Sequence, residues 1–248
     1  MTDPETSNAA SPPAEVQYKP VAPVWHTVVL LVIMAAMATL AARSQHDMIT
    51  KHGRLPAYYT TMIWEWVIVL YIAWGVRRSG GMRELVSGRW RTGKEFGTDV
   101  GIAVGYWVVT GIVLLALSFA LGLTSPAQLE QAKKNISPLL PTNGKELLVW
   151  IALSTTAGIC EEIMFRGYLQ KQFRALMKSE AAGVVLQAIV FGCAHGYQGG
   201  RRMVLIGIYG VMFGALAAWR KNLRPGMIAH TLQDSVSGAA NLASRLLK

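Results

Sequence analysis

Charged residues are scarce in this chain, and so are cysteines. Asp, Glu, Lys and Arg make up only 15% of the 248 residues, against about 25% in a typical soluble domain. The apolar residues, 52% of the chain, gather in long blocks. The two cysteines, Cys160 and Cys193, fall inside such blocks, which favours buried, reduced thiols over a disulfide framework. These features exclude a small disulfide-rich domain and indicate a membrane protein.

Several familiar signals are also missing. The chain has no His-Glu-x-x-His zinc helix and no Gly-x-Ser-x-Gly elbow.

The net charge of +10 comes mostly from short segments between apolar blocks, which suits loops facing anionic lipid headgroups and does not suggest a nucleic-acid partner. Residues 1–23 are polar and do not begin with the basic residues of a cleavable signal, so they are predicted to form a disordered tail.

The apolar blocks have the length that a bilayer requires, about 17–25 residues for a hydrocarbon core of about 30 Å. They predict an all-α fold, a polytopic transmembrane bundle of about seven helices. The expected spans are Val24–Ala42, Tyr58–Val76, Thr98–Leu123, Glu146–Phe165, Ala181–His195, Met203–Trp219 and Pro225–Ala243. Residues 125–144 carry Ser-Pro, Leu-Pro and Asn-Gly turn signals, so we expect a loop with a short surface helix there.

The same pattern predicts the organisation of the chain. We expect the tail to be followed by N-terminal membrane helices over 24–144 and by a catalytic core over 145–243. If the spans alternate, more of the Lys and Arg residues share the side of the N-terminus, which favours a cytoplasmic N-terminus in the cell (inner) membrane.

Ionisable residues are concentrated in the second half of the chain. Such groups cost on the order of 2.5–3.5 kcal/mol each at the centre of a membrane helix. The N-terminal spans contain little beyond Glu65, which argues against a transporter with matching acidic residues in two repeated halves. The later spans carry Glu161, Glu162, Arg166, His195, His230 and Asp234. We expect these groups to converge on one site, because a shared site offers each of them a partner.

The spacing of these residues suggests separate roles. Glu162 and Arg166 are four apart, so they can form an ion pair along one helix, which leaves Glu161 free to act as a base. The plainer interpretation is a polar helix end at the membrane surface. His230 and Asp234 are also four apart, and either could be structural. His195 ends its predicted span, about 21 Å from the start at 1.5 Å per residue, so it reaches Glu161 only through a tilt, a short or re-entrant span, or an embedded 167–180 segment.

A glutamate with two histidines can activate water against an amide bond. The carboxylate takes a proton, one histidine positions water or a metal, and another polar group stabilises the oxyanion. Glu161, His195 and His230 could also supply three ligands to a divalent metal such as Zn²⁺. Both a metal-dependent and a metal-free glutamate mechanism therefore stay open.

The three motifs together resemble the CAAX protease and bacteriocin-processing (CPBP or Abi) family of intramembrane peptidases. They are Glu-Glu-x-x-x-Arg at residues 161–166, Phe-x-x-x-His at 191–195 and His-x-x-x-Asp at 230–234, each on an apolar helix. The resemblance extends over about Lys145–Asn241, whereas residues 1–144 match only as hydrophobic spans.

The resemblance implies catalytic roles for particular residues. Glu161 would be the base that activates water, assisted by His195, and His230 would form an oxyanion-stabilising pair with Asp234. Glu162 and Arg166 would support the site, and the family is often described as metalloprotease. Prenyl-protein proteases of this type usually carry Asn where this chain has Asp234, and an ionised Asp cannot donate a hydrogen bond. This departure argues against a strict prenyl-CAAX role, and Asp234 could instead orient His230 or help hold a metal.

The predicted function is an intramembrane endopeptidase that cleaves a membrane-associated peptide or lipidated protein, either a prenylated CAAX-type or a leader substrate. The alternative is a non-catalytic membrane immunity or scaffold protein that retains the site. No motif residue is lost here, which favours the enzyme.

Overall fold

The computed structural model describes residues 18–247, apart from the side chains of Gln45 and His46. Within this range the chain is a bundle of ten α-helices without strands, interrupted by one π-helix and one short 3₁₀ helix. The predicted all-α class is confirmed. Most of the predicted tail, residues 1–23, lies outside the described range. The elements are α1 (Val24–His52), α2 (Arg54–Val76), α3 (Gly81–Val86), α4 (Gly93–Ala120), α5 (Pro126–Ile136), α6 (Gly144–Glu161), the π-helix (Glu162–Leu169), α7 (Gln170–Met177), α8 (Glu180–Ala194), the 3₁₀ helix (Gly196–Gln198), α9 (Gly200–Arg220) and α10 (Arg224–Leu246).

The predicted number of about seven helices is too low. The seven expected spans correspond to α1, α2, α4, α6, α8, α9 and α10, and the three further helices are α3, α5 and α7. Two of these were hidden for simple reasons: α3 has six residues, and α7 continues the helix that carries Glu161, where a loop was expected. The short helix predicted within residues 125–144 is present as α5.

Five stretches are long and apolar enough to cross a membrane, which identifies the chain as an integral multi-pass membrane protein. They are Val24–Ser44, Arg54–Val76, Gly93–Ala120, Gly144–Met177 and Gly200–Arg220. Two predicted spans are not among them. Helix α8 has only 15 residues, a length of about 22 Å at 1.5 Å per residue. Helix α10 is long enough but carries too many polar residues.

Side-chain caps and backbone turns set the ends of the helices that hold the site. The side chain of Asn143 accepts a hydrogen bond from the Glu146 amide at the start of α6 (2.9 Å), and Ser179 does the same for Ala182 at the start of α8 (3.2 Å). Gly199, at φ 104°, allows the sharp turn between the 3₁₀ helix and α9. These signals place the ends of α6, α8 and α9 where the polar motifs can meet.

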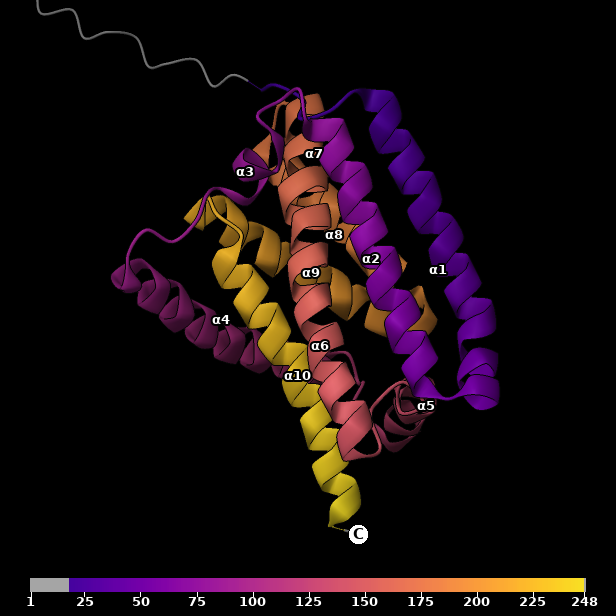
Figure 1. Ribbon diagram of the computed structural model, residues 1–248. Helices are drawn as coiled ribbons and strands as arrows, with labels where there is room; N and C mark the ends of the chain where they lie inside the picture. The colour runs from indigo at the N-terminus through magenta and orange to yellow at the C-terminus, as the bar shows by residue number, and fades with distance from the viewer. Residues whose placement is uncertain (1–17, 248) are drawn as a thin grey trace, which may run out of the picture.

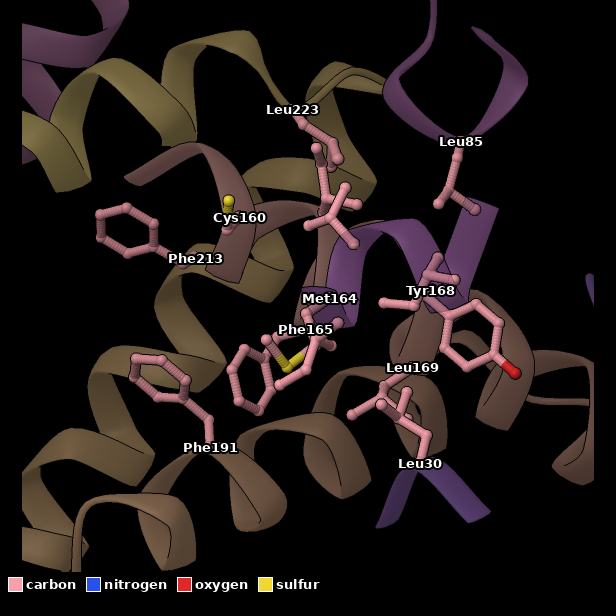
Figure 2. Packing of buried hydrophobic residues seen from close by; sticks show 14 of the residues in the cluster. Leu30, Leu85, Cys160, Met164, Phe165, Tyr168, Leu169, Phe191, Phe213 and Leu223 are labelled. Atoms are coloured by element: carbon pink, nitrogen blue, oxygen red, sulfur yellow. The ribbon is translucent and has the colours of Figure 1, made fainter. Parts of the chain in front are cut away.

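The helices of the second half pack most closely on one another, α8 against α9 and α6 against α10. Figure 1 shows α3 and α7 at one end of the bundle and α5 with the C-terminus at the other. The core is centred on the π-helix, whose eight residues are all buried. Figure 2 shows Met164 and Phe165 of this segment beside Phe191 of α8, and the rings of Phe165 and Phe191 meet edge to face at 4.8 Å.

The cysteine prediction is correct for Cys160 and wrong in part for Cys193. Both thiols are free, but only Cys160 is buried. The side chain of Cys193 lies on the outward face of α8, whereas Phe191, two residues earlier, faces the core. Its apolar neighbours along the sequence therefore did not imply burial.

Candidate active site

The first motif lies where α6 becomes the π-helix. Glu161 is the last residue of α6, and Glu162 and Arg166 belong to the π-helix, a distortion that often accompanies functional sites. Arg166 Nη1 donates to Glu162 Oε1 at 2.9 Å, and at most 1% of either side chain is exposed. The ion pair predicted from the spacing is therefore present, as a fully buried pair within the bundle.

Aromatic rings surround the guanidinium of Arg166. Its central carbon lies 4.5 Å from the ring centre of Phe191, 5.4 Å from that of Phe213 and 5.9 Å from that of Phe165. Such rings attract a cation through their negative faces. Arg166 is thus held by one carboxylate and three rings, which fixes the position of Glu162 as well.

His230 joins the three acidic residues of the site. Its Nδ1 lies 3.3 Å from Glu162 Oε1, so the ring donates an N–H to that carboxylate. Its Nε2 lies 3.7 Å from both Glu161 Oε2 and Asp234 Oδ2. Adjacent glutamates point about 100° apart on a helix. They contact the same imidazole through different nitrogens.

His195 ends α8 and faces the same space. Its Nδ1 lies 2.9 Å from the carbonyl oxygen of Phe191, so this nitrogen carries the proton and donates it. In the neutral ring, Nε2 is then left with a free lone pair. The depth of His195 relative to Glu161 left several arrangements open. In the structure α8 has only 15 residues, and residues 167–177 continue the helix of Glu161.

The motif residues line a cavity of about 570 Å³. Glu161, His195, His230 and Asp234 all contribute to its wall, while Glu162 and Arg166 lie behind it. Glu161 has 16% of its side chain exposed and Asp234 36%, whereas Glu162 has 1%. The structure thus brings the six predicted residues together and separates them into an accessible group and a buried supporting pair.

Glu65 and Tyr197 are among the polar residues of the cavity that the sequence argument missed. Glu65 of α2 is buried, lines the same cavity, and its Oε2 has no hydrogen-bond partner among the described residues. Tyr197 follows His195 in the 3₁₀ helix, where burial raises the pKa of its phenol to about 12, so the group stays a neutral donor. The isolated position of Glu65 in an apolar span was the signal that could have identified it.

The candidate ligand set for a metal does not assemble. No three His, Cys, Asp or Glu side chains within residues 18–247 come close enough to hold one ion. Nδ1 of His195 donates to a backbone carbonyl and Nδ1 of His230 to Glu162, so a metal could contact these two rings only through Nε2. The residues as placed therefore do not fit the expected Glu161, His195 and His230 site, and no catalytic step is derived through a metal.

Part of the chain, which includes the residues of this site, is similar to a known protein family. Residues 143–236 match the family model described as type II CAAX prenyl endopeptidase Rce1-like. This segment is similar to the CAAX protease family. The match confirms the resemblance inferred from the three motifs and covers all of them. No curated protein and no solved structure matches the chain.

The family match indicates the general function of the protein. A CAAX-type protease domain within an integral membrane protein indicates an intramembrane endopeptidase that acts on a peptide or protein substrate. The segment begins at the cap of α6 and ends two residues after Asp234, so the CAAX protease domain includes the whole of α6, α8 and α9. The remaining walls of its cavity come mainly from α1, α2, α4 and the region of α5.

Proposed function

We propose that the protein hydrolyses a peptide bond of a membrane-associated substrate by water that Glu161 activates. One observation carries the proposal. Glu162 Oε1 accepts from both Arg166 and His230 and this side chain lies outside the cavity wall, whereas Glu161 lines the cavity and its Oε2 accepts no hydrogen bond from the described residues. An unoccupied carboxylate oxygen within a polar cavity can take a proton from water, and a carboxylate already held by two donors is a poorer base.

Each of the neighbouring groups has a step to perform. Glu161 takes a proton from water, the hydroxide forms a bond to the carbonyl carbon, and negative charge develops on the carbonyl oxygen. The Nε2–H of protonated His230 stabilises that oxyanion. When the C–N bond breaks, Glu161 returns its proton to the leaving amine. His195 Nε2 accepts a hydrogen bond from the water and orients it, since Nδ1 of the same ring is fixed by the Phe191 carbonyl.

Asp234 has a positioning role in this scheme. An ionised carboxylate cannot donate a hydrogen bond to an oxyanion, but Asp234 Oδ2 lies 3.7 Å from His230 Nε2 and favours the protonated ring. The Asp found here in place of the usual Asn is then compatible with catalysis, because the donor to the oxyanion is the imidazolium.

The cavity also suggests the kind of substrate. Much of its wall is apolar, with Leu114, Leu139 and Leu205 among the contributors, and it extends from Glu161 towards the turn between α1 and α2. Such a wall suits a peptide with an attached lipid or an apolar segment. We therefore propose a prenylated CAAX-type peptide or another membrane-anchored peptide as the substrate class.

The test is proteolysis by the full chain in liposomes. The substrate is a farnesylated peptide with a fluorophore and a quencher on either side of the expected bond. Glu161→Gln is expected to lower kcat by about 10³-fold and His195→Ala by about 10²-fold, within the range of general acid–base catalysis. The matched controls are Glu130→Gln and His52→Ala, because both side chains are exposed away from the cavity.

Full retention of cleavage by Glu161→Gln would overturn the mechanism. If the native chain cleaves no membrane peptide and its cellular effect survives Glu161→Gln, the non-catalytic immunity or scaffold function is the correct one.

A further inference from the structure

The cavity wall contains one Lys or Arg side chain among the described residues. This is Arg202, in the first turn of α9. The wall also contains the carboxyl groups of Glu65, Glu161 and Asp234 and the imidazoles of His195 and His230. A permanent cation in such a wall attracts a negatively charged group of a substrate.

Arg202 differs from the other partly buried cations of the chain in having no ion-pair or hydrogen-bond partner among the described residues. Arg166 is paired with Glu162, and Arg220 and Arg224 share Asp99 at 3.5 and 2.8 Å. Arg54 lies 3.9 Å from Glu146. Arg202 is itself half-buried, whereas the adjacent Arg201 is exposed and lies outside the cavity wall.

We propose that Arg202 binds a carboxylate of the peptide substrate, its C-terminal main-chain carboxylate. This inference rests on the proposed function. A guanidinium matches a carboxylate through two parallel N–H donors, and a CAAX motif ends the chain of its bearer, so its last residue carries a free carboxylate. His230 already contacts Glu161, Glu162 and Asp234, which leaves Arg202 as the cation of the wall without a carboxylate partner among the described residues.

The surroundings of Arg202 support a fixed anion site. Tyr197 and Gln198 precede it and line the same cavity, and the Gln198 side chain donates to the Tyr197 hydroxyl at 3.2 Å. Asn135, in α5, donates to the Gln198 carbonyl at 3.1 Å and ties this turn in place. Anchoring the terminus here sets how many residues separate the end of the peptide from Glu161. Arg202 would therefore determine the position of the cleaved bond.

The experiment measures binding and cleavage of the same peptide with a free C-terminal acid or with a C-terminal amide. For the native chain in detergent, the free acid is expected to bind at least tenfold more tightly than the amide, by fluorescence polarisation. Arg202→Gln is expected to remove this preference by weakening only the acid, and Arg202→Lys to retain part of it. Arg201→Gln is the matched control and is expected to bind as the native chain does.

A second pair of peptides separates the two sources of a carboxylate. Both end in an amide, and they carry either Glu or Gln as the last side chain. Discrimination between these two that depends on Arg202, with none between acid and amide, would place a side-chain carboxylate at Arg202 and overturn the proposal.

Equal binding of acid and amide by the native chain, or an unchanged preference in Arg202→Gln, would also overturn it, whether or not the peptides are cleaved. A native chain that prefers the acid but cleaves neither peptide would support the anion site and count against the proposed protease function alone. Thermal unfolding of each variant in detergent confirms that it is folded.

Discussion

His230 Nε2 lies 3.7 Å from Glu161 Oε2, so the proposed base and the proposed oxyanion donor share one edge of the cavity. The other ring nitrogen is fixed by Glu162. An imidazole held at one nitrogen and facing two carboxylates at the other is suited to remain protonated until substrate arrives. Charge that develops on a substrate oxygen can then replace part of the interaction with Glu161.

The first prediction concerns Asp234. Replacing Asp234 by Asn keeps an oxygen near His230 and adds an amide donor, so cleavage is expected to stay within about tenfold of the native rate. Asp234→Ala removes both and is expected to lower kcat by about 10²-fold, the effect of losing one group that stabilises a transition state. Cleavage rates are measured at saturating peptide, and equal loss in both variants would show that His230 needs the negative charge of Asp234 rather than an oxygen at that position.

The second prediction concerns the buried pair behind the cavity. Removing one partner, by Glu162→Gln or Arg166→Met, leaves an unpaired buried charge and is expected to reduce the free energy of unfolding by about 3–5 kcal/mol. The double variant leaves no charge behind and is expected to recover much of that loss. Unfolding in mild detergent with added denaturant measures both.

A surface pair provides the control for this comparison. Arg174 and Glu180 lie 3.1 Å apart with 36% and 48% of their side chains exposed. Arg174→Ala is expected to cost less than about 1 kcal/mol, because solvent screens an exposed pair. A loss in Arg166→Met no larger than that would show that the pair contributes little to the fold.

Much of the fold could be predicted because helices that cross a bilayer appear in the sequence as apolar blocks of a characteristic length. The helices α3, α5 and α7 show the limit of that signal. None is a separate apolar block: α3 is a single short turn, α5 is polar, and α7 continues the helix of Glu161 with polar residues such as Gln170 and Gln172 that are buried and hydrogen-bonded. Only tertiary partners reveal that such residues belong inside the bundle.

The site was predictable to the extent that its residues follow helical spacing. The Glu162–Arg166 pair needs only the i, i+4 rule, and it is present. The link from His230 to both glutamates depends on how α10 crosses α6, which no local pattern contains. Glu65 comes from α2, nearly 100 residues away in sequence from Glu161, and Arg202 looked like one more loop cation beside Arg201. Both enter the site through packing.

The third prediction concerns metal dependence. No three His, Cys, Asp or Glu side chains among residues 18–247 lie close enough together to hold one metal ion. We expect dialysis against EDTA, followed by assay with 1,10-phenanthroline, to leave cleavage within about twofold of the untreated rate, because the glutamate mechanism uses only side chains. Loss of activity that Zn²⁺ restores would assign the same residues to a metal site.

The fourth prediction concerns the contact between α6 and α10. A Cβ added at Gly158 would clash with Thr231 Oγ1 and lie 2.9 Å from the Met227 carbonyl oxygen, so the backbone would have to move. Gly158→Ala is therefore expected to separate Glu161 from His230 and to reduce cleavage by about 10²-fold, as small misplacements at active sites do. Gly111→Ala in α4 is the control, since nothing lies within 4 Å of its added Cβ. Equal activity of the two variants would contradict this account.

The last prediction concerns Glu65, a buried acid with an unsatisfied oxygen in a membrane helix. Burying such a polar group without a partner costs about 1–3 kcal/mol, so Glu65→Leu is expected to raise the free energy of unfolding by a similar amount. Natural proteins often tolerate a destabilising residue where their activity depends on it. Cleavage by Glu65→Leu is therefore expected to fall at least tenfold. Glu65→Gln keeps the polarity and is expected to lie between the two. Thermal unfolding and cleavage measured on the same samples test both expectations. A Glu65→Leu variant that is more stable and fully active would show that Glu65 has no role in catalysis.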